Sequence, residues 1–374
     1  MTRKLYDENA YTVTFTAKVL SCEGNAVVLD ATAFVPEGGG QAPDKGTLNG
    51  IPVTDVQISG GIITHICTSP LPVGETVEGV IDWKTRFDRM QQHSGEHILS
   101  GIVHAMKGYD NVGFHMGADF TTVDFSGKLT DEEISEIQKK ANEAVTENRP
   151  IRAWYPAEEE LPHLPYRSKK ELTEAVRLVE IENTDLCACC APHVRSTAEV
   201  CPIVILSREV IHGGTRLTML CGSRAMEHIS AVLEQNKTVS AALSAKPLET
   251  AAAVRRMAEE LGNTKFQLSQ TVKELHTALA EAHRGKGNVV LFRQSGDAGK
   301  LACAVSETCG GFCAVFVKTE AGFRYAISGE NVRQLGQNLH AALGGKGGGK
   351  PELVQGSIPA RQEDIEAFFR EVTP

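Results

Sequence analysis

The sequence has little of what marks a membrane or secreted protein. No apolar run in its 374 residues approaches the roughly 20 residues that a membrane-spanning helix needs. The N-terminus, Met1-Thr2-Arg3-Lys4, carries no hydrophobic signal core. The ten cysteines do not form a short disulfide framework, so buried thiols or metal ligands are expected instead. These absences predict a cytoplasmic protein that does not enter a membrane.

Positive charge is also scarce, since the formal net charge is -9. This balance argues against bulk attraction to nucleic acid, but it leaves room for a local basic face. From Lys286 to Lys350 the chain holds eight Lys or Arg against four Asp or Glu, so this segment is basic within an acidic chain. A local basic module of this kind fits nucleic-acid binding.

The chain is long enough for two or three domains with proper cores. Its patterns predict an α+β multidomain fold in four segments. Residues 1–82 hold short β-branched runs between Gly and Asn turns, which predict a small antiparallel barrel or sandwich. Residues 83–223 mix helices and strands and form an α+β domain, 224–285 are helical, and 286–374 alternate strand and helix as an α/β domain.

Two pairs of residues at helical spacing predict a metal site. His93 and His97 lie four apart in a stretch from Trp83 to Met106 whose apolar residues recur at helical spacing. At that spacing both imidazoles lie on one helix face. Cys189 and His193, again four apart, follow about ninety residues later. Three imidazoles and a thiolate make a tetrahedral Zn²⁺ set.

Two points about this site stay open on the sequence alone. Cys187 and Cys190 offer further thiols, and either could replace Cys189 as a ligand. Four protein ligands would close the shell and leave zinc to position the substrate, whereas one labile ligand would let zinc activate water. Glu96 lies between the two histidines and is a candidate base, but its offset of ~100° from His97 leaves its direction undecided.

Two stretches of the second half predict contacts with other macromolecules. The run Gly344-Gly345-Lys346-Gly347-Gly348-Gly349-Lys350-Pro351 is typical of a loop, whose N–H groups and two lysines suit phosphates. A seam with alternating spacings of three and four predicts either a helical hairpin, in which two helices of one chain fold back on each other, or a coiled coil that joins two chains into a homodimer through this arm. The seam consists of Val254, Met257, Leu261, Thr264, Leu268, Thr271, Leu275 and Ala278.

These motifs resemble a known family. Phe34 to Gln41 with Asp44 and Gly46, the pair His93 and His97, the stretch Cys189 to Val194, and Gly222-Ser223-Arg224-Ala225 are similar, in family order, to the editing half of alanyl-tRNA synthetases and to AlaX-type editing proteins. The run from Gly344 to Gly356 resembles the DHH-associated domain. The resemblance begins at the editing part, so the long form of the free-standing editor is expected rather than a synthetase.

The resemblance implies a zinc-containing hydrolase that removes serine, with glycine as a second candidate, from mischarged tRNA(Ala). It implies that Thr32 contacts the serine hydroxyl, that Gln41 lies near the scissile ester, and that Lys346 and Lys350 bind tRNA. The family's C-G-G-T-H is replaced here by Cys189-Cys190-Ala191-Pro192-His193, and its usual tyrosine by Val35. These departures affect the expected substrate preference more than metal binding.

Three other classes compete with this reading. His93-Ser94-Gly95-Glu96-His97 also spells H-x-x-E-H, the motif of a zinc peptidase that would take a downstream glutamate as third ligand. The altered segment Cys190-Ala191-Pro192 favours a tRNA-binding protein with a degenerate site. The C-terminal domain is shared with phosphoesterases, but the Asp-His-His centre that they need is not visible in the sequence.

Overall fold

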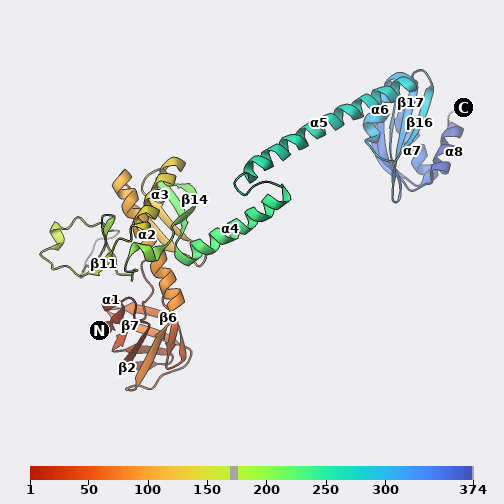
Figure 1. Ribbon diagram of the computed structural model, residues 1–374. Coiled ribbons are helices and arrows are strands. Elements are labelled where there is room, and N and C mark those ends of the chain that lie inside the picture. The colour runs from red at the N-terminus through yellow and green to blue at the C-terminus, as the bar shows by residue number, and fades with distance from the viewer. Residues whose placement is uncertain (169–175, 373–374) are drawn as a thin grey trace. The chain divides into compact units, whose positions relative to one another are not determined.

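The computed structural model describes residues 1–168 and 176–372, and the chain divides into two compact units, Met1–Thr238 and Val239–Pro374 (Figure 1). Each unit combines helices and sheets, so the chain is a multidomain α+β protein. Within the described ranges, no helix is both long and apolar enough to cross a membrane.

The first unit begins with six antiparallel strands that close into a barrel, in the order β2-β3-β7-β6-β5-β8. Alternate residues point inward, as the burial of Val77 and Ile81 in β8 illustrates. The short helix α1 (Leu5–Glu8) and the parallel pair β1 (Arg3–Lys4) and β4 (Ala31–Thr32) lie beside it. The barrel strands are β2 Thr14–Glu23, β3 Ala26–Leu29, β5 Gly46–Leu48, β6 Ile51–Ser59, β7 Ile62–Cys67 and β8 Thr76–Ile81.

The second part of this unit is built around helix α2 (Trp83–Lys107), whose middle from Met90 to Gly101 is buried. Helix α3 (Asp131–Thr146) packs beside it and begins with a capping box between Thr130 and Glu133. A four-stranded sheet has the order β14-β15-β10-β9, and a three-stranded sheet the order β11-β12-β13. Their bounds are β9 Asn111–Met116, β10 Thr121–Phe125, β11 Ile151–Trp154, β12 Leu178–Ile181, β13 Asp185–Ala188, β14 Val204–Ile211 and β15 Gly214–Leu220; the 3-10 turns are Leu161–His163 and Thr197–Val200.

Helix α4 (Gly222–Ala242) starts on the buried face of α2. The Gln92 side chain donates to the Cys221 carbonyl (2.8 Å) and accepts from the Cys221 N–H (2.9 Å). Arg224 forms a two-pronged ion pair with Asp88, at 2.8 and 2.6 Å. The motif from Gly222 to Ala225 therefore anchors this helix start on the helix that carries His93.

The second unit contains a five-stranded sheet in the order β16-β17-β18-β20-β19, in which only the β16–β17 pair is parallel. Helix α6 and the end of α5 cover one face, while α7 and α8 cover the other. The bounds are α5 Thr250–Ala282, β16 Gly287–Arg293, α6 Ala298–Cys309, β17 Gly310–Thr319, β18 Gly322–Ser328, α7 Val332–Leu343, β19 Lys346–Lys350, β20 Leu353–Ile358 and α8 Gln362–Val372.

One sequence expectation about this unit is wrong. The glycine-lysine run is not a loop, because residues 346–350 form the edge strand β19, paired antiparallel with β20. Gly347 and Gly349 approach β20 so closely that a Cβ would collide with the carbonyls of Gln355 and Leu353. The glycines thus permit a tightly paired edge strand, whose residues are all exposed.

Candidate metal centre

Helix α2 supplies two of the expected metal ligands. It starts after Asp82, whose carboxylate accepts a hydrogen bond from the Thr85 N–H, and it ends at Gly108 in the left-handed conformation. His93 and His97 lie in its buried middle with their ring centroids 5.5 Å apart. The predicted spacing on one helix face is confirmed.

The other two ligands lie in the stretch that follows β13. Arg177 holds this stretch in place, because its guanidinium donates to the carbonyls of Cys189 (3.0 Å) and Ala191 (2.9 Å). The Cys189 N–H donates in turn to the Arg177 carbonyl, at 3.0 Å. The hydrogen bonds of Arg177 and the buried Pro192 therefore fix the backbone of this stretch, which lacks the glycines of the C-G-G-T-H motif.

All four side chains meet at one point. The ligand atoms of His93, His97, Cys189 and His193 lie within 4.8 Å of one another. The Cys189 Sγ is 3.6 Å from His93 Nε2 and 3.5 Å from His193 Nε2. A tetrahedral zinc ion with its usual bond lengths to nitrogen and sulfur would place those atoms about 3.5 Å apart. The donor set therefore fits Zn²⁺ in chemistry and in spacing.

The Nδ1 atoms of the two α2 histidines face away from the cluster and have partners of their own. His93 Nδ1 donates to the Gln41 amide oxygen at 3.2 Å, and His97 Nδ1 donates to Asp185 Oδ2 at 3.0 Å. Both acceptors select the tautomer that leaves a lone pair on Nε2. Such outer partners orient metal-binding imidazoles and raise their basicity.

His193 is held in a similar way. Its Nδ1 is 3.0 Å from Ser94 Oγ, and the same oxygen accepts the Val194 N–H at 3.2 Å. Ser94 therefore joins helix α2 to the loop that carries the second ligand pair. Burial lowers the pKa of His193 to about 3, although hydrogen bonding to the Cys189 sulfur opposes this shift.

The electrostatics favour a thiolate in the cluster. Burial by itself would raise the pKa of the Cys189 thiol, but electrostatic stabilisation of the thiolate by His93, His193 and His97 outweighs burial and holds that pKa well below its usual range. Burial likewise disfavours the charged form of Asp185, yet His97 and Arg167 lower its pKa. A thiolate is the form of cysteine that binds metal.

The structure distinguishes the three neighbouring cysteines. Cys189 belongs to the four-residue cluster, whereas Cys190 is exposed and belongs to no group of metal-binding side chains among the described residues. Cys187 is buried in a second group with His97 and Asp185. Because Asp185 also forms a two-pronged ion pair with Arg167, at 2.8 Å for each bond, this second group braces His97.

Gln41 reaches the cluster from the glycine-rich segment of the barrel, residues 34–46, which follows β4 and ends at the first residue of β5. Gly40 packs on strand β9, where its carbonyl accepts the Met116 N–H at 3.1 Å. A Cβ on Gly40 would lie 2.5 Å from the Phe114 carbonyl oxygen, and its φ is +81°, so the position requires glycine. The neighbouring Gln41 side chain is 3% exposed, and its Nε2 has no hydrogen-bond partner among residues 1–168 and 176–372.

Glu96 is not a solvated helix residue, because only 1% of it is exposed. Its Oε1 accepts hydrogen bonds from Ser100 Oγ (2.6 Å) and from the Asn111 side-chain amide. Its Oε2 lies 4.0 Å from His97 Nε2, the nitrogen that faces the cluster. The carboxylate is therefore close to the ligand set.

The structure does not bring Thr32 into contact with these residues. Thr32 is fully buried beside the barrel core, where its hydroxyl is 2.8 Å from His65 Nε2 and accepts the Phe34 N–H at 3.1 Å. The His65 Nδ1–H donates to the Val27 carbonyl, so Nε2 accepts the Thr32 hydroxyl hydrogen. The hydroxyl is therefore engaged within the barrel.

Sequence reasoning missed the outer partners of the metal ligands: Ser94, Asp185 and Arg167. Ser94 lies inside the histidine motif itself, so its position next to His93 was visible, but its partner was not. Asp185 occupies a buried position at the start of strand β13, whose other residues are apolar. An acidic residue in an otherwise apolar strand is the feature of the sequence that could have pointed to it.

Three family descriptions match parts of the chain. Residues 7–85 match tRNA synthetases class II (A), residues 176–217 match the threonyl and alanyl tRNA synthetase second additional domain, and residues 288–373 match the DHHA1 domain. Cys189 and His193 lie within the second of these regions.

Known proteins resemble the chain over nearly its full length. It is 33% identical over 397 residues to an alanine–tRNA ligase of Pyrococcus abyssi, which covers 98% of this chain and 43% of the ligase. It is 28% identical over 365 residues to the alanyl-tRNA editing protein Aarsd1-B of Xenopus laevis, which covers 93% of this chain and 89% of that protein. The chain thus spans less than half the length of the ligases that it matches, and most of the Xenopus protein.

Proposed function

Because the chain belongs to the family that joins alanyl-tRNA editing proteins with the matching part of alanine–tRNA ligases, we propose that it hydrolyses tRNA(Ala) mischarged with serine, and with glycine as a second substrate. An alanine pocket discriminates against such small differences only roughly 10- to 200-fold, so a separate hydrolytic site is needed. The convergence of His93, His97, Cys189 and His193 beside Gln41 is the observation that carries the proposal.

The four converging side chains would hold Zn²⁺, since their spacing matches its tetrahedral geometry. Bound there, zinc would supply a positive charge that fixes the four side chains and helps to orient the bound aminoacyl group. Four protein ligands complete a tetrahedral shell, which favours the positioning role over direct activation of water.

Gln41 is proposed to hold the ester. Its Oε1 accepts the hydrogen bond from His93, while its buried Nε2 lacks a partner within the described part of the chain. A buried donor without a partner costs roughly 1–3 kcal/mol, so it is expected to serve a ligand. The Gln41 amide would donate a hydrogen bond to the carbonyl oxygen of the bound ester, whose negative charge grows as water attacks.

Glu96 is proposed to transfer a proton from the attacking water to the leaving ribose oxygen. Water adds to the carbonyl carbon, the bond to the ribose oxygen breaks, and the amino acid and free tRNA leave. The Glu96 carboxylate would take the proton from water and return it to the departing ribose oxygen. Its burial and its place 4.0 Å from His97 Nε2 support this role.

The ligand set argues against the peptidase alternative. A peptidase with the H-x-x-E-H motif would complete its site with a downstream glutamate, whereas the groups that gather around His93 and His97 include Cys189 and His193. The binding-protein alternative rests on Cys190-Ala191-Pro192. The altered residues in that segment do not separate the four ligand side chains, which favours a catalytically competent site.

The second unit is proposed to bind the body of the tRNA. Lys346 and Lys350 lie four apart on the exposed edge strand β19 and therefore on the same side of it. Their Cα atoms are separated by roughly 13 Å at the usual rise of a strand, a span over which both can contact one RNA backbone. This exposed cationic edge supports phosphate contacts rather than base readout.

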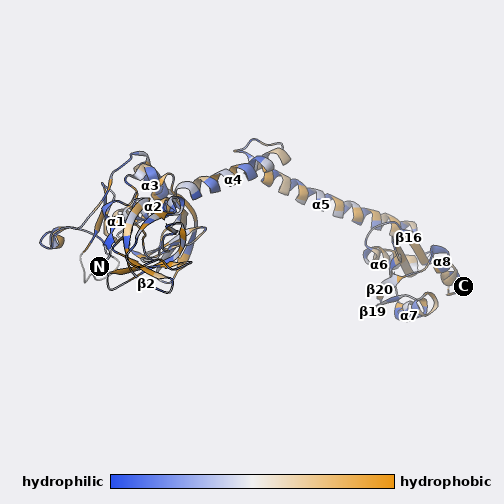
Figure 2. Cartoon of the chain, turned by 90° about the horizontal axis from the view of Figure 1, so that it is seen from below, coloured by the Kyte–Doolittle hydropathy of each residue, from blue (hydrophilic) through white to orange (hydrophobic). Residues whose placement is uncertain are grey.

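We propose that α5 pairs with the same helix of a second chain, so that the apolar seam becomes the interface of a homodimer. Val254, Met257, Leu261, Leu268 and Leu275 are between 44% and 62% exposed in the single chain. In Figure 2, hydrophilic and hydrophobic colours alternate along this helix. A coiled coil would bury the seam. We expect a dimeric mass by light scattering, and a monomeric mass for the variant L261E/L268E.

The decisive experiment is deacylation of Ser-tRNA(Ala), Gly-tRNA(Ala) and Ala-tRNA(Ala) by the purified protein, before and after zinc removal. We expect rapid loss of serine, retention of alanine, and loss and recovery of activity as zinc is removed and restored. The variant Glu96→Gln should retain zinc and lose activity. Zinc-loaded protein that binds tRNA(Ala) without hydrolysing any ester would instead establish the binding-protein alternative.

A further inference from the structure

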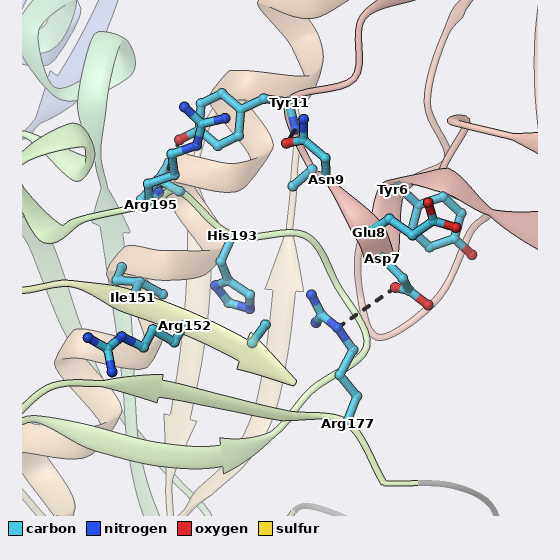
Figure 3. A pocket seen from close by; sticks show the side chains of 13 residues that line it. Tyr6, Asp7, Glu8, Asn9, Tyr11, Ile151, Arg152, Arg177, His193 and Arg195 are labelled. Atoms are coloured by element: carbon cyan, nitrogen blue, oxygen red, sulfur yellow. Dashed lines mark hydrogen bonds and ion pairs between the residues drawn. The ribbon is translucent and has the colours of Figure 1, made fainter. Parts of the chain in front are cut away.

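A cavity of about 150 Å³ opens beside His193 (Figure 3). The segment from Tyr6 to Tyr11 forms one wall, and the start of β11 together with the stretch His193–Arg195 forms the other. Known ligand pockets for drug-sized molecules measure roughly 300–1,000 Å³, so this one suits a single small group rather than a whole nucleotide.

The cavity has an excess of uncompensated positive charge. Its carboxylates are already paired: Asp7 accepts the Tyr155 hydroxyl (2.9 Å) and lies 3.8 Å from Arg177, and Glu8 is bonded to Arg3 at 2.7 Å. The other two arginines of the lining, Arg152 and Arg195, have no carboxylate partner within the described part of the chain.

Arg195 is held in a fixed orientation. Its guanidinium lies over the Tyr11 ring, 4.0 Å from the ring centre, and Figure 3 shows the two groups against each other. Tyr11 is itself fixed, because its hydroxyl donates to Glu199 (2.6 Å) and its ring packs on Trp83. A guanidinium stacked in this way keeps its N–H edge free for the two-pronged contacts that bind phosphate.

We propose that this cavity receives the phosphate that precedes the terminal nucleoside of the tRNA acceptor end, with Arg195 as its binding residue and Arg152, at the other edge of the lining in Figure 3, adding positive charge. The inference rests on the proposed function, because that phosphate is the negative charge nearest to the aminoacyl ester. A site next to His193 binds it while the ester lies at the ligand set. The contact would specify an RNA chain rather than a free amino acid ester.

The test compares two substrates with the double variant R152A/R195A. One substrate is an acceptor-stem RNA charged with serine, and the other is seryl-adenosine, which carries no phosphate. The kcat/KM for the RNA should fall roughly 10- to 100-fold more than that for seryl-adenosine, as expected for lost charge-assisted hydrogen bonds. The variant K84A/K128A removes the same charge from exposed positions outside the cavity and should show no such difference.

Two results would overturn the phosphate site. An equal loss on both substrates would mean that the cavity holds the aminoacyl or ribose part, and an unchanged kcat/KM on the RNA would remove the site altogether. If R152A/R195A fails to fold, R152Q/R195K keeps the packing on Tyr11. The ratio of its kcat/KM for the RNA to its kcat/KM for seryl-adenosine should be smaller than that of the unaltered protein.

Failure of the proposed function has a separate signature. In that case the unaltered protein hydrolyses neither ester. Binding of uncharged acceptor-stem RNA, measured by fluorescence anisotropy, then decides the cavity by itself: R152A/R195A must weaken it and K84A/K128A must not.

Discussion

Arg86 and Asp44 form a buried ion pair that joins the glycine-rich segment of the barrel to helix α2. Neither side chain is more than 1% exposed, and Arg86 Nε donates to Asp44 Oδ2 at 2.9 Å. Arg86 also donates to the Ala10 and Ala33 carbonyls, while Asp44 Oδ2 accepts the Val35 N–H at 2.7 Å. The pair thus places Gln41 and His93, which come from different parts of the unit, next to each other.

Breaking this pair should destabilise the protein strongly. Arg86→Met keeps much of the side-chain volume but leaves the buried Asp44 carboxylate with only Arg89, 3.8 Å away, as a cation, which costs up to roughly 3–5 kcal/mol. Urea unfolding followed by circular dichroism measures the change. R86M/D44N should recover part of the loss, because the buried carboxylate charge is then removed as well. Arg3→Met, which removes the exposed pair with Glu8, should leave the unfolding midpoint unchanged.

Gly40→Ala should damage the site through packing on β9. The added Cβ would lie 2.5 Å from the Phe114 carbonyl oxygen and would displace the segment that carries Gln41. Gly39→Ala is a matched control, since Gly39 also has a positive φ (+60°) but has no atom near its Cβ position. We expect deacylation to fall at least tenfold further in Gly40→Ala than in Gly39→Ala. Equal activity of the two variants would mean that contact with β9 does not position Gln41.

Metal content should separate the three neighbouring cysteines. Cys189→Ser removes the sulfur that faces two imidazole nitrogens, so bound zinc should fall from about one ion per chain to nearly none. Cys190→Ser and Cys187→Ser should retain the ion, because neither residue belongs to the four-residue cluster. Elemental analysis after dialysis gives the answer. Retention of zinc by Cys189→Ser would assign the thiol ligand elsewhere.

His65 should make stability depend on pH. Burial in the barrel lowers its pKa to about 4 from the ordinary 6.5, against the opposing hydrogen bond to Val27. The unfolded chain therefore binds the proton first, and the full contribution of His65 is present above pH 6.5. As pH falls from about 6.5 to 4, the free energy of unfolding should drop by roughly 3 kcal/mol on this account.

Urea unfolding at pH 4.5, 5.5 and 6.5 tests this dependence. His65→Gln should flatten the curve in that window, whereas His212→Gln, at an exposed position, should leave it as it is. Identical pH curves for the unaltered protein and His65→Gln would assign the dependence to other groups.

Lys346 and Lys350 should contribute to tRNA affinity through salt-dependent contacts. Replacing both with Ala should weaken binding and lower the slope of log affinity against log salt by roughly 1 for each lysine. K300A/K318A removes two exposed cations of the same unit that lie outside β19 and should change the slope less. Filter binding at several salt concentrations gives both slopes. An unchanged slope for K346A/K350A would assign the edge strand another role.

Local sequence determined those features that depend on neighbours along the chain. Helix α2, with His93 and His97 on one face, and helix α3, with its cap at Thr130, follow from hydrogen bonds and side-chain pairs three or four residues apart. The strand β10, Thr121–Phe125, also follows from local sequence, since its residue types suit an extended chain. The spacing also predicted that the histidine pair and the later cysteine–histidine pair would form one site, but it left open which of three cysteines would join it.

Tertiary structure alone decided the features whose partners are distant in sequence. The glycine-lysine run became a strand because β20 pairs with it, and the barrel closed because β8 pairs with both β2 and β5. Cys189 entered the cluster because Arg177 shapes its loop, and Thr32 was engaged by His65 from another strand. The composition of a short segment cannot specify these contacts, because a ladder hydrogen bond or a buried ion pair depends on which distant segment arrives beside it.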